Sequence, residues 1–153
     1  MKTPKEKFLK EELIALLRKL PSSQKGSWGK MNAQQMVEHL SGAFRIASGK
    51  HKMQPALSPE ITEKYHAFLM TENPFKENTP NKLLPDEPEP FKNATMEGAI
   101  AELQKEIDGF FSVYAANTGL RVVNPFFGNL NYEEQVRLLY KHTTHHARQF
   151  GLL

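Results

Sequence analysis

The sequence contains no cysteine among its 153 residues, and this absence removes several kinds of chemistry. A chain without cysteine has no disulfide framework, no thiolate zinc site and no cysteine nucleophile. Any metal site must therefore use histidine, aspartate, glutamate or water as ligands. The absence is compatible with a reducing cytoplasm, which is the location that we expect for the protein.

Long hydrophobic runs are also absent. No stretch approaches the roughly 18 apolar residues of a membrane span, so we expect no membrane partner. The first 20 residues alternate charged and apolar side chains, and so lack the uninterrupted apolar core of a signal peptide. Period-two alternation, the pattern of half-buried strands, is nearly missing. These absences favour a helical protein.

A concentrated charge of one sign is lacking as well. The net charge is only +3, and the lysines are spread along the chain, whereas nucleic-acid-binding domains usually show a clustered basic face. An isoelectric point near 9.1 is the one feature that favours nucleic acid, and we expect no such partner. The length and an apolar content of 39% are typical of a single domain, here residues 1–153.

Two segments in the first third of the chain carry helix signals. "TPKE" provides Thr3 as an N-cap followed by proline at the first helical position. Apolar residues then recur at helical spacing until Pro21. "NAQQ" places Asn32 three residues before Gln35, which is the spacing of a capping box. It predicts a second helix that ends near Gly49.

The second half of the chain predicts two further helices. One covers about 95–117, and the other begins after Asn131, with Glu134 in the capping-box position, and runs almost to the end. A long crossover precedes them, with a short helix after Ser58 and a proline-rich stretch at 71–91 without regular structure. Four helices with one long connection predict an all-α four-helix bundle. The apolar stretch at 122–130 is expected to be a loop, with at most a short extended piece at 120–123.

Three of the six histidines fall within five residues, in "KHTTHHARQF". Successive helical residues turn by about 100°, so His142 and His146 share one flank of the apolar stripe. His145 points to the opposite side and is expected to be exposed. His39 lies inside the apolar stripe of the second predicted helix. Imidazoles from two facing helices could thus hold one divalent metal with coordination positions open for water.

Other interpretations of these histidines are open. A lone His39 is more often a core histidine with one hydrogen bond. The pair lacks the glutamate of the zincin motif, since Thr143 stands in its place. Three buried imidazoles without a shared partner, however, would be hard to satisfy. Glu38 points about 100° away from His39 and is expected on the surface, so no general base accompanies the ligands.

The metal itself is not named by the sequence. Zinc, nickel, iron, manganese and cobalt all accept imidazole with open positions, and we expect zinc or nickel. Because protons compete with metal for imidazole, occupancy is expected to fall below about pH 6.5. Of the remaining histidines, His51 follows a predicted helix end among lysines and is expected to be solvated, whereas His66 could lie in the core or on the surface.

Two stretches, "WGKMNAQQMVEHL" and "KHTTHHARQFGL", together resemble the DinB-like superfamily of metal-binding four-helix bundles. The phrase "NPFFGNLNYEEQVRLLYKHTTHHARQFGL" resembles its DUF1569 branch more narrowly. The resemblance implies a metal ligand on the second helix, at His39, and a ligand pair on the fourth, at His142 and His146. It also implies a second-shell role for Gln149, which follows the pair.

The resemblance implies enzymatic activity without naming the reaction. Better-understood members are transferases and isomerases that use low-molecular-weight thiols such as bacillithiol or mycothiol, and others are metal-dependent hydrolases. In the former the metal would lower the pKa of the thiol. We expect a small-molecule substrate that enters near Trp28, Phe126 and Phe127. The alternative is a non-catalytic, metal-stabilised module that forms a homodimer or accompanies a phenylacetate-degradation enzyme.

Overall fold

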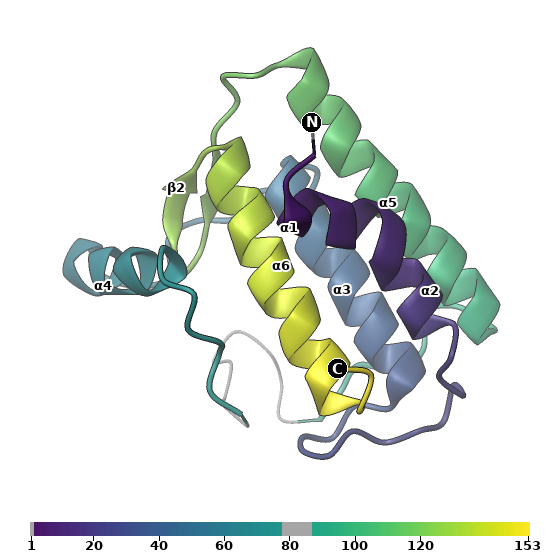
Figure 1. Cartoon of the computed structure of the whole chain (residues 1–153). Coiled ribbons are helices and arrows are strands. Elements are labelled where there is room, and N and C mark those ends of the chain that lie inside the picture. The colour runs from purple at the N-terminus through teal and green to yellow at the C-terminus, as the bar shows by residue number, and fades with distance from the viewer. Residues whose placement is uncertain (1, 78–86) are drawn as a thin grey trace.

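The computed structural model describes residues 2–77 and 87–153 and is predominantly helical (Figure 1). Its elements follow one another as α1 (Pro4–Lys7), the π-helical turn η1 (Phe8–Glu12), α2 (Leu13–Leu17), α3 (Ala33–Ser48), α4 (Pro59–Leu69), α5 (Met96–Ala116), β1 (Val122–Asn124), β2 (Gly128–Leu130) and α6 (Tyr132–Gln149). The all-α class predicted from the sequence is therefore correct apart from one short hairpin.

The two long helices that carry the histidines begin where local capping signals place them. At the start of α3, the Asn32 side chain accepts a hydrogen bond from the Gln35 backbone N–H, and the Gln35 side chain accepts one from Asn32. Asn131 and Glu134 form the same reciprocal pair at the start of α6. Gly49 ends α3 in the left-handed conformation, with φ of 83°, which glycine adopts without steric cost. These observations confirm both predicted helix starts.

The N-terminal helix differs from its prediction. Thr3 caps it as expected, because its side chain accepts a hydrogen bond from the Glu6 backbone N–H. The helix then passes through η1, where the Leu13 N–H bonds to the Phe8 carbonyl oxygen five residues back. Such a turn holds one extra residue and rotates the following side chains. The α-helix ends at Leu17, before the predicted limit.

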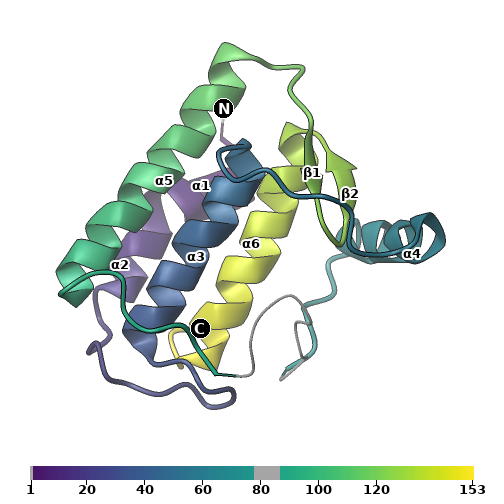
Figure 2. The same ribbon diagram turned by 180° about the vertical axis from the view of Figure 1, so that it is seen from behind.

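The main core lies between four packed helical segments. Figures 1 and 2 show α3 beside both α5 and α6, with the N-terminal segment α1–α2 crossing the same two helices from the other side. The fully buried side chains in this core are predominantly leucine, isoleucine and phenylalanine, and the largest are Phe44, Phe110, Leu9, Leu13, Leu17, Met36, Leu40, Ile100, Leu103 and Ile107. This packing brings the histidine-bearing faces of α3 and α6 together.

The stretch at 122–130 is a hairpin, so its prediction as a loop was wrong. β1 and β2 pair in an antiparallel register that joins Val122 to Leu130. The Asn124 side chain accepts hydrogen bonds from the backbone N–H groups of Phe126 and Phe127, and Gly128 has a positive φ of 94°. An Asx turn and a glycine at this position together close a tight turn.

A smaller apolar cluster fastens α4 and the hairpin to α6. It consists of Leu69, Phe127, Leu130 and Leu138, with Phe75 and Phe126 packed against it. Beyond this contact α4 projects from the side of the body (Figures 1 and 2). Ser58 caps it as predicted, by accepting a hydrogen bond from the Ile61 backbone N–H.

The proline-rich stretch is irregular where it is described. Residues 71–77 and 87–91 form neither helix nor strand, as predicted, and the positions between them lie outside the described residues. Within the described part of the chain, no helix is both long and apolar enough to cross a bilayer.

Candidate metal centre

Three imidazoles meet between α3 and α6. His39 comes from α3, and His142 and His146 come from successive turns of α6. Nε2 of His142 lies 3.0 Å from Nε2 of His39 and 3.0 Å from Nε2 of His146. The possible ligand atoms of the three residues all lie within 4.8 Å of one another. The structure therefore brings together the three histidines that helical periodicity selected.

These distances fit a shared ion. Two nitrogens that each lie about 2.0–2.1 Å from a tetrahedral metal are about 3.3 Å apart, which is close to the separations observed here. The rings come from two different helices, and each turns Nε2 toward the same point. The residues present therefore fit a divalent ion held by three neutral imidazoles.

The hydrogen bonds available to the three histidines also favour a shared ion. Nδ1 of His146 lies 2.7 Å from Oε1 of Gln149, an atom that only accepts, so Nδ1 carries the proton and Nε2 has a free lone pair. The other end of the Gln149 amide donates to the Trp28 carbonyl oxygen at 2.7 Å, which fixes the amide's orientation. A single proton on His142 Nε2 cannot bond well to both neighbouring nitrogens, whereas a cation at their centre satisfies all of them.

Burial keeps the three imidazoles neutral. His146 is buried, and His39 and His142 are partly buried. Because the apolar surroundings disfavour the charged form, the pKa of His39 falls to about 4 and that of His146 to about 3. The pKa of His142 also lies well below its ordinary value, first through burial and then through its neighbours His146 and His39. Neutral imidazole is the form that binds metal.

Gln149 ties the centre to the loop between α2 and α3. Its backbone oxygen accepts a hydrogen bond of 2.7 Å from the Ser27 N–H, in addition to the bond from its side chain to the Trp28 carbonyl. Two glycines permit this close approach. A Cβ on Gly26 would lie 2.8 Å from Cγ of Gln149, and one on Gly29 would lie 2.9 Å from its Nε2. Gly29 also has a positive φ of 78°.

Aromatic rings cover one side of the histidines. Phe75 packs edge-on against His142 and His145, with ring centroids 6.4 and 5.9 Å away, and Phe127 lies 6.2 Å from Phe75. Trp28 lies 5.5 Å from His145. His145 is therefore half-buried between aromatic rings, so the expectation that it would be exposed was wrong.

The structure places the three aromatic residues expected near the entrance at different distances from the histidines. Trp28 packs on His145 and Phe127 packs on Phe75, whereas Phe126 stacks on Tyr65 of α4, with centroids 6.5 Å apart. Phe75, which packs edge-on against His142, was missed by the sequence analysis. It sits in the proline-rich stretch, where no periodic pattern indicates which side chains face inward.

The residue before His39 is not on the surface, which corrects the sequence expectation. Glu38 is only 8% exposed. Its carboxylate accepts hydrogen bonds of 2.9 Å from the backbone N–H groups of Lys92 and Asn93, and one of 3.1 Å from the Asn93 side chain. These bonds more than offset the effect of burial and hold the pKa of Glu38 below its ordinary value. Glu38 therefore fastens the end of the crossover to α3.

The residue before His142 is a buried cation, whereas Glu38 is a buried anion. Lys141 is 6% exposed, and its ammonium donates hydrogen bonds to the carbonyl oxygens of Thr71, at 3.0 Å, and Asn73. A buried anion on α3 and a buried cation on α6 thus bind the backbone of the two ends of the proline-rich stretch. Each lies one residue before a histidine of the cluster.

The other histidines lie away from the centre. His51 is exposed, as predicted. His66 pairs with Glu134 at the start of α6, and so helps to fasten α4 to the body.

Comparisons of the chain with protein-family models, with curated proteins and with solved structures find no match.

Proposed function

We propose that the protein is a metal-dependent enzyme of the DinB-like type, with His39, His142 and His146 as ligands of one divalent ion, zinc or nickel. The observation that supports it is the convergence of three Nε2 atoms on one point. In this interpretation the segment α1–α2 and helices α3, α5 and α6 form a four-helix bundle with one long crossover between α3 and α5.

The bound ion would supply Lewis acidity, which lowers the pKa of a thiol or a water molecule. The chain's own residues prepare the site for it. Gln149 holds the His146 ring in the tautomer that presents Nε2, and burial keeps the rings unprotonated. Three protein ligands leave coordination open for an exogenous group. Phe75 and Trp28 provide an apolar flank for a small organic substrate.

As the reaction, transfer of a thiol to an electrophile is favoured over hydrolysis. Within the described residues, Gln149 is the only side chain other than the histidines themselves that is hydrogen-bonded to the cluster. No described carboxylate is hydrogen-bonded to it, and Glu89 acts on His39 only through its charge. A thiol has a much lower pKa than water, and needs less help to lose its proton. We therefore propose a low-molecular-weight thiol as nucleophile and a small electrophile as the second substrate.

The test is thiol consumption with purified protein loaded with zinc or with nickel. Bacillithiol, mycothiol and simpler thiols are offered with an aromatic electrophile, and loss of free thiol is followed. Turnover is expected with one thiol, and should disappear on chelation and in His142→Ala, but persist in His145→Ala. Absence of turnover with every thiol, or full activity in metal-free His142→Ala, contradicts the proposal.

A second candidate is a metal-stabilised binding module, favoured by exposed apolar side chains on and just after α4. Ile61 and Tyr65 on α4, and Met70 directly after it, are 44%, 42% and 47% exposed, although the Tyr65 ring also packs on Phe126 and Phe127. Exposed apolar side chains that lie near one another can mark an interaction surface. Metal binding that raises the melting temperature without any turnover, together with a dimer in sedimentation that is lost in Tyr65→Glu, would favour this module.

A further inference from the structure

A row of cations runs along α6 on a side remote from the histidines. Arg137, Lys141 and Arg148 are spaced by four and seven residues, so they share one face of the helix. At about 100° per residue, this face lies roughly 140° around the axis from His142 and His146. The row is therefore separate from the candidate metal centre, although both are built on the same helix.

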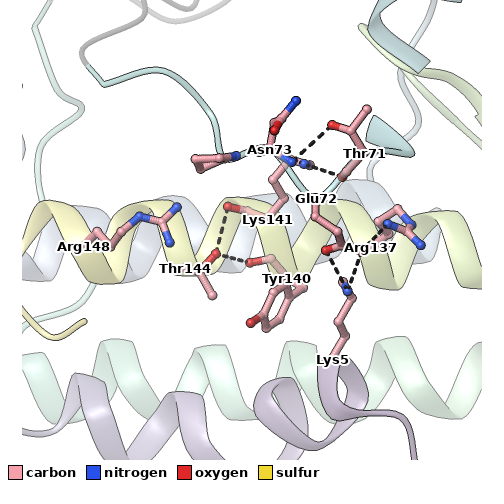
Figure 3. A pocket seen from close by; sticks show the side chains of 10 residues that line it. Lys5, Thr71, Glu72, Asn73, Arg137, Tyr140, Lys141, Thr144 and Arg148 are labelled. Atoms are coloured by element: carbon pink, nitrogen blue, oxygen red, sulfur yellow. Dashed lines mark hydrogen bonds and ion pairs between the residues drawn. The ribbon is translucent and has the colours of Figure 1, made fainter. Parts of the chain in front are cut away.

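The row lines a cavity of about 260 Å³. Figure 3 shows this cavity between α6, the segment at 71–74 and the first turn of α1, from which Lys5 points toward the same space. Water occupies about 30 Å³ per molecule in the liquid, so the cavity has room for roughly eight water molecules. A ligand larger than a single monatomic ion fits it.

The cavity has a strong excess of positive charge. Among the described residues that line it, four are cationic and one, Glu72, is acidic. Glu72 is held by Lys5, at 3.2 Å, and by Arg137, at 3.0 Å, and both cations lower its pKa. Its side chain is nevertheless 72% exposed. A largely solvated carboxylate therefore occupies one anion position in an otherwise cationic cavity.

The remaining cations are not neutralised. Lys141 is buried and bonds only to carbonyl oxygens. Within the part of the chain that the structure describes, Arg148 forms no ion pair. An added anion would relieve repulsion among these groups.

We propose that this cavity binds a small phosphate-bearing anion, with Glu72 occupying the anion position in its absence. Guanidinium groups bind phosphate oxygens in a bidentate manner, and lysine adds a point charge. Arg137 donates a hydrogen bond of 3.4 Å to the Met70 carbonyl oxygen, which does not depend on Glu72, and Lys141 is held by its two carbonyl partners. Two of the cations are thus held in place before the ligand arrives, and the elongated row suits a diphosphate better than a single phosphate.

The experiment titrates the full-length protein with inorganic phosphate and with pyrophosphate by calorimetry, at constant ionic strength. Four variants accompany the wild type. Glu72→Gln removes the internal carboxylate, and Arg148→Gln removes a cation that forms no ion pair with any described residue. Lys105→Gln makes the same charge change at an exposed position on α5 and serves as the matched control. His142→Ala removes anion binding at a metal ion, because phosphate can also ligate a metal.

Glu72→Gln and Arg148→Gln each change the charge near the ligand by one unit. A change of one unit is expected to change the affinity for the ligand about fivefold. Glu72→Gln should bind pyrophosphate about fivefold more tightly, and Arg148→Gln about fivefold more weakly. Lys105→Gln and His142→Ala should bind like wild type. The proposal is overturned if no binding is measurable, if Lys105→Gln weakens binding as much as Arg148→Gln, or if binding disappears in His142→Ala.

Discussion

His146 shows how a single residue can be prepared for metal binding before any ion is present. Its Nδ1 is bonded to Gln149, so the ring can neither rotate freely nor change tautomer without losing that bond. Nε2 is left facing the two other imidazoles. Second-shell contacts of this kind orient metal ligands and raise their basicity. The contact joins residues three positions apart on the same helix, but only the family resemblance, and not the spacing, pointed to Gln149.

Replacing Gln149 separates its two roles. In Gln149→Leu the acceptor for His146 is lost, and metal affinity should fall by about ten- to a hundredfold. In Gln149→Glu the acceptor for His146 remains, while the donor to the Trp28 carbonyl is replaced by a carboxylate oxygen that repels it, so affinity should stay closer to that of wild type than in Gln149→Leu. Competition with a chromophoric chelator measures both. Equal metal affinities of Gln149→Leu and wild type would show that the hydrogen bond from His146 to Gln149 does not support metal binding.

The lowered histidine pKa values predict how the metal-free protein responds to acid. Between pH 6.5, the ordinary value, and about pH 4, the pKa of His39 in the fold, the unfolded chain binds more protons than the folded one. Stability therefore falls as the pH falls through this window. His39 alone contributes a loss of about 3 kcal/mol, since one pKa unit corresponds to about 1.36 kcal/mol.

Urea unfolding of the metal-free protein at several pH values measures this loss. His39→Asn should show a shallower decline than wild type over the window, and His51→Asn, which alters an exposed histidine, should decline like wild type. Parallel curves for all three proteins would contradict the lowered pKa. The same shift implies that protons displace the metal nearer pH 4 than pH 6.5, which refines the expectation drawn from ordinary imidazole.

At the scale of elements, the sequence predicts best what is decided locally. The capping residues Asn32 and Asn131 act within one turn, so the starts of α3 and α6 could be predicted from adjacent letters. The π-helical turn at Phe8–Glu12 has no such signal, because it depends on how Leu13 meets the core. Likewise, the burial of Glu38 depends on Lys92 and its neighbour returning from more than fifty positions away.

Glu38 and Lys141, which have opposite charges, hold the two ends of the proline-rich stretch through hydrogen bonds to its backbone. In Glu38→Gln the acceptor of two backbone N–H groups is replaced by a neutral amide of nearly the same size. The free energy of unfolding should fall by about 2 kcal/mol, as is typical for hydrogen bonds to a charged group. Hydrogen exchange should speed up at the amides of Lys92 and Asn93.

The matched control is Glu97→Gln on α5. Its carboxylate is 74% exposed and lies 3.7 Å from Arg18, so its removal should change stability by less than about 0.5 kcal/mol. Unchanged protection of the Lys92 and Asn93 amides in Glu38→Gln would show that the carboxylate does not hold the crossover.

At the scale of the whole molecule, the fold brings histidine side chains from distant parts of the chain to one point. His39 and His142 are 103 positions apart, and helical periodicity sufficed to predict their meeting because each lies on the inward flank of its own helix. Phe75 could not be predicted in this way. Its position depends on the hairpin and on the hydrogen bonds that Lys141 donates to the backbone of the proline-rich stretch. Both are tertiary contacts, which leave no periodic signal in the sequence.

The central claim is that three imidazoles share one metal ion. The most direct test is elemental analysis of protein purified without a histidine tag, comparing wild type with His142→Ala and with His145→Ala. His145 is the adjacent histidine that does not face the shared point, and it controls for the loss of any imidazole from the same helix. We predict about one divalent ion per chain in wild type and in His145→Ala, and little or none in His142→Ala. Equal metal content in His142→Ala and wild type would contradict the account.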